Sequence, residues 1–312
     1  MVATSSSQLY RDAGIADGRS PTLLLGQSVL VRDGRIAWIR PADAEEDPGP
    51  AADLTVVDAL GATIVPGMVD CHSHLTGPGG ANWIERFADP AAIGQLDAGA
   101  DFVKLYLDGA DPAIAPWSAA DVRRVVEAVH ARGAKVTAHS GRLSGARVGA
   151  DGGVDSLEHG FELDADVAAT MASYGGAVVS TLAVMASWLS FGSTTALPRF
   201  ASAEGRARIH ERLERAQESI RIAHAAGVRI CAGTDFGGGS TRANQLAWEA
   251  ESLVAAGLEP WEALAAATWR GGELLGEPEA GVIHEGGPAD FFLVHGDPLS
   301  DPTAIWRVWK IA

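Results

Sequence analysis

The sequence of 312 residues contains only two cysteines, Cys71 and Cys231, and each lies inside an apolar run. Two cysteines cannot form the disulfide framework of a small secreted domain, so we expect a reducing compartment. Basic residues are also scarce, with 24 Lys and Arg against 40 Asp and Glu, and the formal net charge is −16. So acidic a chain lacks the basic face that nucleic-acid phosphates require, and we expect no nucleic-acid partner.

Long hydrophobic runs are missing as well. No stretch approaches 18 uninterrupted apolar residues, which argues against a membrane span. Residues 1–18 lack the basic segment and following apolar segment of a secretory signal. We therefore expect a cytoplasmic protein without a membrane partner. Its 47% hydrophobic residues suffice for a substantial core.

Strand patterns occupy both ends of the chain. The pair Asp33-Gly34 separates two short apolar runs and is typical of a two-residue hairpin turn. Apolar runs typical of strands cover residues 23–31, 35–39, 56–65, 290–294 and 306–311. We predict that residues 1–65 and 281–312 together form one small composite β-sandwich domain.

The middle of the chain alternates between strand and helix patterns. Predicted strands cover residues 63–70, 102–106, 135–139, 154–159, 177–181 and 228–235. Predicted helices cover residues 118–133, 164–174, 204–226, 244–256 and 260–275. Parallel neighbouring strands need a crossover helix between them, so this alternation favours an α/β fold. We predict a TIM-like β/α barrel over residues 66–280, with about six units and therefore incomplete.

His72 and His74 directly follow the first predicted strand of this barrel. Alternate residues of a strand share a face, so both imidazoles can reach one metal ion. A single His-x-His pair is more often structural or surface-exposed than metal-binding. Its interpretation therefore depends on what the later strands carry.

Polar residues recur at the ends of those later strands. Lys104 lies in the apolar run 102–106, where a buried ammonium is costly unless it is paired or neutralised. His139, His159 and Asp235 end three further predicted strands. Ligands and catalytic groups of a β/α barrel collect at the C-terminal ends of its strands, so the ordered set predicts a metal site. For Lys104 alone, snorkelling of the side chain to the strand end remains an alternative.

Several sequence motifs accompany these residues. They are VPGMVDCHSH at 65–74, GADFVK at 99–104, VTAH at 136–139, SLEHG at 156–160, GTD at 233–235, PAD at 288–290 and DPL at 297–299. With them the sequence resembles the amidohydrolase superfamily, in particular the branch of imidazolonepropionase-like enzymes and Xaa-Pro or Xaa-Arg dipeptidases. The resemblance covers nearly the whole chain except residues 75–100. The family places two more β/α units there, so we expect an internal deletion around those residues.

The resemblance also implies roles for individual residues. Its metal ligands would be His72, His74 and Asp235 for one divalent ion, His139 and His159 for a second, and Lys104 for both. Lys104 would carry a carbamate derived from carbon dioxide, and zinc is the expected metal, as one or two ions. Asp235 would take the proton of the attacking water and pass it to the leaving amine. Asp235 and Lys104 are thus the expected catalytic residues.

The predicted function is hydrolysis of an amide or other C–N bond by a metal-activated hydroxide. The expected partner is a small-molecule substrate: a cyclic amide, a dipeptide or an N-acyl compound. Two alternatives stay open, a non-catalytic metal-binding remnant of such an enzyme and a phosphotriester or lactone hydrolase that uses the same site. Unpaired strand edges of a shortened barrel would have to be covered, which predicts a homo-oligomer as one solution.

Four further residues are weaker candidates. Glu158 precedes His159 in a strand, so we expect it on the opposite face in a structural role. Trp83, Arg142 and Trp188 fall in predicted loops from which they could line a pocket.

Overall fold

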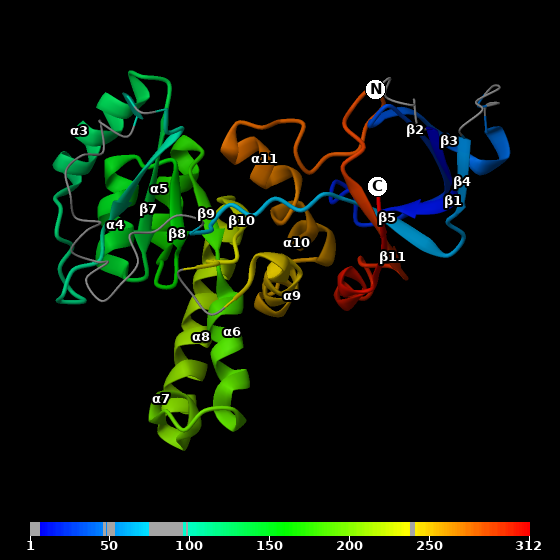
Figure 1. Cartoon of the computed structure of the whole chain (residues 1–312). Helices are drawn as coiled ribbons and strands as arrows, with labels where there is room; N and C mark the ends of the chain where they lie inside the picture. The colour runs from blue at the N-terminus through cyan, green and yellow to red at the C-terminus, as the bar shows by residue number, and fades with distance from the viewer. Residues whose placement is uncertain (1–6, 46–47, 49–53, 75–95, 98, 238–240) are drawn as a thin grey trace. The chain divides into compact units, whose positions relative to one another are not determined.

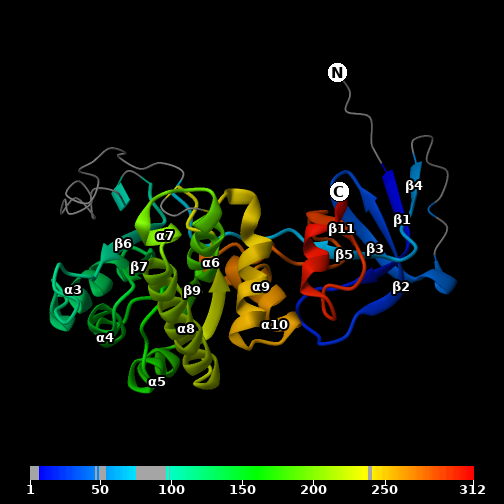
Figure 2. The same cartoon turned by 90° about the horizontal axis from the view of Figure 1, so that it is seen from below.

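The computed structural model describes residues 7–45, 48, 54–74, 96–97, 99–237 and 241–312. The chain divides into two compact units, one of Met1–Val69 with Glu259–Ala312 and one of Asp70–Leu258. We call them the terminal unit and the middle unit (Figures 1 and 2). Most of the expected internal deletion, and with it Trp83, lies outside the described residues.

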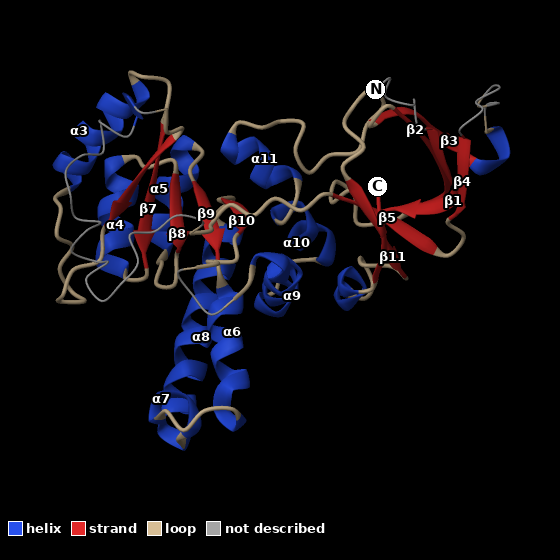
Figure 3. Ribbon diagram, viewed as in Figure 1, coloured by secondary structure: helices blue, strands red, loops and turns tan. Residues whose placement is uncertain are grey.

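The terminal unit contains one mixed sheet of seven strands (Figure 3). Their order is β12 (Val308–Ile311), β11 (Phe291–His295), β5 (Ala62–Pro66), β1 (Ser7–Ile15), β2 (Leu24–Arg32) and β3 (Arg35–Pro41), with β4 (Leu54–Asp58) paired to β1. Strands from both ends of the chain therefore share one sheet. Hydrogen bonds join all seven described strands into a single sheet, so the predicted β-sandwich is not confirmed.

The hairpin between β2 and β3 forms where the sequence predicts it. Asp33 and Gly34 have φ of 50° and 73°, as a type I′ turn requires. One face of the sheet buries an apolar core, in which the rings of Tyr10 and Phe291 meet edge to face at 5.0 Å. Burial of this face holds the terminal unit together.

Among its described residues, the terminal unit also contains two α-helices and two short 3-10 helices. They are η1 (Ala42–Ala44), α10 (Pro260–Ala266), α11 (Trp269–Leu275) and η4 (Pro302–Trp306). The single helix predicted over residues 260–275 is wrong, since it is split before α11. Thr268 has φ of −132° and ψ of −112°, which is incompatible with a continuous helix.

The middle unit contains a sheet of five parallel strands. Their order is β10 (Arg229–Ala232), β9 (Ala177–Ser180), β8 (Ser156–His159), β7 (Lys135–Ser140) and β6 (Phe102–Tyr106). Every residue of β8 and β9 is buried, as in a parallel sheet covered on both faces. This is the predicted β/α arrangement, but the described strands do not close into a barrel.

The described helices of the middle unit connect and cover these strands. They are α3 (Ala119–His130), α4 (Leu143–Gly152), α5 (Ala165–Tyr174), α6 (Leu182–Ser190), η2 (Phe191–Ser193), α7 (Pro198–Ala201), α8 (Ala203–Ala225), η3 (Ala243–Gln245) and α9 (Leu246–Ala256). In Figure 1, α6, α7 and the first part of α8 project beyond the C-terminal ends of the strands. Trp188 therefore lies in a helix, not in the loop we expected. Among the described helices, none has the length and apolar character needed to cross a bilayer.

The predicted strand 63–70 is wrong, because β5 ends at Pro66 and pairs with β11 in the terminal sheet. Proline supplies no N–H to a ladder, and a Cβ on Gly67 would clash with the carboxylate of Asp290. Residues 71–74 instead run beside β10 and its continuation. Cys71 N donates to the carbonyl oxygen of Ala232 at 3.0 Å, and Asp235 N donates to that of His72 at 2.8 Å. This pairing still delivers the histidine pair to the C-terminal end of the parallel sheet.

Candidate metal centre

His72, His74 and Asp235 converge at that end of the sheet. The Nε2 atoms of the two histidines lie 3.2 Å apart. Oδ1 of Asp235 lies 3.3 Å from Nε2 of His72 and 3.2 Å from Nε2 of His74. Ligands placed about 2.1 Å from a tetrahedral zinc ion stand about 3.4 Å from one another. The spacing and chemistry of this triad therefore fit a divalent metal ion.

Asp70 holds the two segments that supply the triad. Its Oδ1 accepts hydrogen bonds from the N–H of His72 at 3.1 Å and of Thr234 at 2.9 Å. Its Oδ2 accepts from Oγ1 of Thr234 at 2.5 Å. One carboxylate thus joins the segment after β5 to the segment after β10.

His159 and Asp235 both have left-handed backbone conformations, with φ of 74° and 53°. Non-glycine residues rarely adopt this region, and such residues are concentrated at functional sites. The ring of His159 lies 4.6 Å from that of His72 and 4.6 Å from that of His139. Ligand atoms of His72, His159 and Asp235 lie within 4.8 Å of one another. His159 therefore adjoins the first triad as well as its expected partner His139.

The expectation that Glu158 faces away from the metal centre is wrong. Its side chain reaches the centre. It is buried, and its Oε2 accepts a hydrogen bond from Nδ1 of His72. Oγ of Ser156 and Oγ1 of Thr137 bind its other oxygen. With Nδ1 of His72 held this way, Nε2 keeps its lone pair for an ion. The alternation of side chains along a strand predicts Glu158 and His159 on opposite faces. The left-handed backbone of His159 breaks this alternation at the strand end, so both side chains reach the metal centre.

Lys104 lies in the same cluster, with Nζ 3.3 Å from Nε2 of His72. Burial lowers the pKa of its ammonium group. The amine is therefore neutral more often than that of a solvated lysine. A neutral amine is the form that reacts with carbon dioxide.

His139 lies at the side of the cluster. Its ring stacks on Tyr106 with centroids 4.8 Å apart, and its Nε2 is 3.5 Å from Oδ2 of Asp108. The same Oδ2 accepts a hydrogen bond from the N–H of Gly141 at 2.8 Å. Asp108 is a neighbour of the centre that sequence reasoning missed, because it stands in a loop two positions beyond its strand.

The charge states of the buried groups favour a cation. Burial and the charges of His72 and His139 hold the pKa of His159 well below its usual range, so the ring is neutral and can ligate. Burial alone would raise the pKa of Asp235, but hydrogen bonds from His72 and His74 outweigh it and lower the pKa. Burial would also raise the pKa of Glu158, but the adjacent His72 outweighs it and keeps that pKa below its usual range. Two buried carboxylates thus stay ionised beside the neutral ring of His159. Although burial opposes it, the charge of Glu158 and the hydrogen bond to Asp235 raise the pKa of His72, and a bound cation would take the place of its proton.

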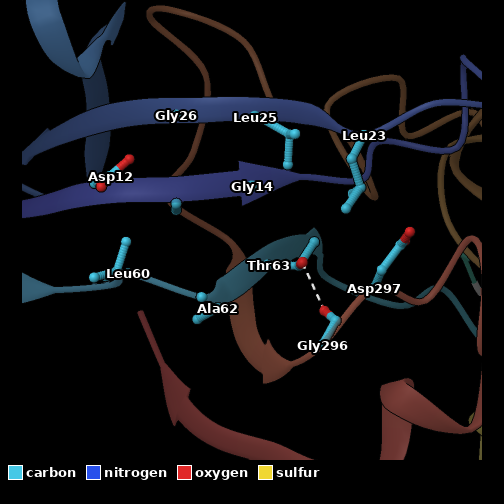
Figure 4. A pocket seen from close by; sticks show the side chains of 12 residues that line it. Asp12, Gly14, Leu23, Leu25, Gly26, Leu60, Ala62, Thr63, Gly296 and Asp297 are labelled. Carbon is cyan, nitrogen blue, oxygen red and sulfur yellow. Dashed lines mark hydrogen bonds between the residues drawn. The ribbon is translucent and has the colours of Figure 1, made fainter.

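A hollow of about 400 Å³ in the terminal unit contains none of these residues (Figure 4). Leucine side chains line it together with Asp12 and Asp297, and Oγ1 of Thr63 donates to the carbonyl oxygen of Gly296 at 2.7 Å. Within the described residues, the hollow brings together no group of histidines or carboxylates comparable to the metal centre. The candidate chemistry therefore belongs to the middle unit.

Comparison with known proteins identifies the family of this chain. A model of the amidohydrolase family matches residues 85–311. An uncharacterized protein of Mycobacterium tuberculosis is 32% identical over 223 residues, which are 68% of this chain and 57% of the relative. Ochratoxinase of Aspergillus niger is 29% identical over 231 residues, 69% of this chain and 46% of the enzyme. The chain thus spans about half the length of the curated relatives it matches.

Solved structures share the fold. A prolidase crystallised with N-methylphosphonate-L-proline has a TM-score of 0.79 and 20% sequence identity, over 98% of each chain. At this identity the similarity shows the fold alone. It agrees with the TIM-barrel-like α/β class that the sequence predicted.

Proposed function

Because the chain belongs to the amidohydrolase family, we propose that it hydrolyses a C–N bond with the help of a divalent metal ion, zinc above all. The convergence of His72, His74 and Asp235 within 3.3 Å carries the proposal. Family membership supports C–N hydrolysis in general. The substrate class, a cyclic amide, a dipeptide or an N-acyl compound, is part of the proposal.

Five side chains of the candidate metal centre would hold up to two divalent ions. His72, His74 and Asp235 would bind one ion, and His139 with His159 would bind a second. A divalent ion there supplies Lewis-acid activation of water and of the substrate carbonyl. Glu158 orients His72, and Oγ1 of Thr181 lies 2.8 Å from Nδ1 of His159 and orients that ring.

Asp235 is the proposed proton carrier. Its carboxylate is ionised because its pKa is low, so it can accept the proton of the attacking water. It then returns this proton to the nitrogen of the leaving group as the C–N bond breaks. A low pKa makes the protonated acid a strong donor to that nitrogen.

Lys104 is proposed to carry a carbamate. The neutral Nζ forms an N–C bond with carbon dioxide and loses one proton, which leaves a carboxylate on the side chain. This reaction removes a buried positive charge and provides an anionic ligand next to His72. A Lys104→Ala variant should lose metal and activity, and short-chain carboxylic acids should restore part of both. The carbamate itself should give a ¹³C resonance after exposure to ¹³CO₂.

The test of function combines metal analysis with a substrate panel. Protein purified with zinc should contain bound metal and should hydrolyse at least one member of a panel of N-acyl amino acids, dipeptides and cyclic amides. Turnover of phosphotriesters or lactones alone would support the alternative hydrolase and contradict C–N specificity. Bound metal without turnover of any compound would instead identify the chain as a non-catalytic remnant.

A homo-oligomer also remains part of the proposal. Within the described residues, β6 pairs only with β7 and leaves its other edge unpaired. Light scattering on a size-exclusion column would show whether a second copy covers it. The small-molecule partner, the absence of nucleic-acid and membrane partners and the cytoplasmic location stay predictions.

A further inference from the structure

Three arginines gather around one glutamate in the middle unit. Nη1 of Arg142 lies 3.1 Å from Oε1 of Glu162, and Nη1 of Arg215 lies 3.7 Å from the same oxygen. The guanidinium carbon of Arg212 stands 5.9 Å from the ring centroid of Trp188. The charge of Arg212 also interacts with the charges of Arg142, Glu162 and Arg215. We call these three arginines and Glu162 the arginine cluster.

The arginine cluster lies at the same end of the sheet as the metal centre. Arg142 comes three residues after His139, beyond the end of β7, and Glu162 comes three residues after His159, beyond the end of β8. The ring of Phe161, next to Glu162, lies 5.2 Å from the ring of His159. The loops that follow these two metal-centre histidines thus carry both Arg142 and Glu162.

Helix α8 supplies the other two arginines from a fixed position. Oγ of Ser219 accepts a hydrogen bond from the N–H of Leu163 at 2.9 Å and donates to the carbonyl oxygen of Phe161 at 3.1 Å. Arg212, Arg215 and Ser219 are spaced by three and four residues, so they share one face of the helix. The face that carries the arginines is therefore docked on the loop after β8.

The arginine cluster keeps a net positive charge, because its three arginines face two carboxylates. Glu162 is shared between Arg142 and Arg215, whose side chains remain 38% and 52% exposed, and Arg215 also pairs with the exposed Glu211 of the same helix at 3.4 Å. Within the described residues, Arg212 has no hydrogen-bond or ion-pair partner, and its contact is the face of Trp188. Partial burial and the charge of Arg142 lower the pKa of Arg212. An added anion would relieve this repulsion, and guanidinium groups match a carboxylate in geometry.

We propose that Arg142, Arg212 and Arg215 bind a carboxylate of the substrate, so that this hydrolase acts on N-acyl amino acids or dipeptides with a free carboxylate. The inference rests on the proposed function, because the arginine cluster selects among compounds that the metal centre cleaves. Cyclic amides without an acidic group would be poor substrates. Trp188 would lie against an apolar part of the same molecule.

The test uses matched pairs of compounds with the zinc-loaded protein. Each N-acetyl amino acid or dipeptide is compared with its carboxamide, which lacks only the negative charge. The unaltered protein should show a kcat/KM at least about 10-fold higher for the acids, expressed mainly in KM, as loss of one charge-assisted contact implies. In Arg142→Gln and Arg212→Gln variants this acid-to-carboxamide ratio should fall towards 1. Arg208→Gln, which removes an exposed charge from the same helix, should keep the ratio.

Each outcome separates the two proposals. Equal turnover of acids and carboxamides would leave C–N hydrolysis standing and overturn the carboxylate site. If no pair is turned over but a cyclic amide is cleaved, C–N hydrolysis stands and the inferred preference for carboxylate substrates is overturned. If no compound of the whole panel is cleaved, the proposed function fails, and calorimetric titration with the same pairs decides the inference. Tighter binding of the acids that disappears in the Arg212→Gln variant would uphold the carboxylate site. Equal binding of both forms would overturn it.

Discussion

The two sheets of this protein differ in where their charged and histidine side chains lie. In the seven-stranded terminal sheet, charged groups pair near solvent, as Arg11 does with Glu45. At the C-terminal end of the five-stranded sheet, His72, Glu158 and His159 are each at most 5% exposed. Burial of polar groups costs free energy unless they are fully hydrogen-bonded or hold an ion. In the middle unit these three side chains are buried together at the C-terminal end of the sheet. Because such burial is unfavourable without an ion or full hydrogen bonding, we infer that this end of the sheet is the functional one.

Left-handed residues show the same contrast. Asp33 of the terminal unit sits in a hairpin turn, where such a conformation serves chain reversal. His159 and Asp235 of the middle unit sit at strand ends inside the metal centre. The same backbone conformation thus serves a turn at Asp33 and ligand placement at His159 and Asp235. The following experiments test whether the middle unit carries the function and the terminal unit does not.

The largest expected effect comes from Asp235→Asn. The amide cannot accept and return a proton, so kcat should fall by roughly 10²–10⁴-fold in assays of the compounds that the native protein cleaves. Asp12→Asn is the matched control, because Asp12 also has a left-handed backbone, with φ of 60°, and asparagine tolerates that conformation. Activity of the control should stay within about twofold of the unaltered protein. An Asp235→Asn variant with native kcat would remove Asp235 from the mechanism.

The second largest expected effect is on zinc affinity, in the Glu158→Gln variant. Loss of the charged acceptor at Nδ1 of His72 should weaken zinc affinity by about 10–100-fold in a chelator competition titration. Glu45→Gln is the control, since Glu45 is also hydrogen-bonded to a serine, Ser28, but lies in the terminal unit. Equal zinc affinity in the two variants would contradict the positioning role of Glu158.

Glu249 predicts a pH effect on stability. It is fully buried in α9 and accepts hydrogen bonds from Oγ of Ser180 at 2.5 Å and from the N–H of Ala183 at 2.7 Å. Burial raises its pKa from 4.5 to about 7. The native state thus binds this proton more tightly than the unfolded state. This contribution is complete below about pH 4.5 and is lost as the pH rises to about 7, a change of about 3 kcal/mol.

Urea unfolding between pH 4.5 and 8 would measure this effect. Relative to a Glu249→Gln variant, which carries no titratable group there, the unaltered protein should lose stability as the pH rises. A constant difference in free energy of unfolding across this range would show that Glu249 is ionised in the native protein at all these pH values.

The smallest effect is expected at the surface of the terminal unit. Glu45→Gln removes the negative partner of Arg11, whose side chain is 48% exposed. Exposed ion pairs contribute between about 0 and 1 kcal/mol, so the free energy of unfolding should change by no more than that. A larger loss in the same urea titration would show that polar pairs of the two units differ less than their burial indicates.

Much of the fold could be predicted from local chemistry. Ser118 begins α3 by accepting a hydrogen bond from the N–H of Asp121 at 3.1 Å, as its position before an apolar helix face predicts. Helix α4 was missed because its segment contains three glycines, which have low helix propensity. The structure explains one of them, since a Cβ on Gly145 would lie 2.7 Å from Oδ1 of Asp108. Tertiary packing thus decides this helix, and a single sequence does not show that packing.

The candidate site also contains residues that the sequence could predict and residues that it could not. His72 and His74 could be paired from the sequence because alternate positions of an extended chain share a face. Glu158 could not be found, since its approach to His72 depends on the left-handed backbone of the next residue. The arginine cluster was equally hidden, because Arg142 and Arg215 meet only when α8 docks beyond the strand ends. Conformations and dockings of this kind arise from the whole fold.

The carboxylate of Asp70 also sets an order of events during biosynthesis. It bonds to Thr234, which lies 164 positions further along the chain. A nascent chain therefore has no complete donor set until the segment after β10 has left the ribosome and docked. Binding of an ion by all three ligands therefore follows this docking, and the metal content of freshly made protein would report whether the two segments have met.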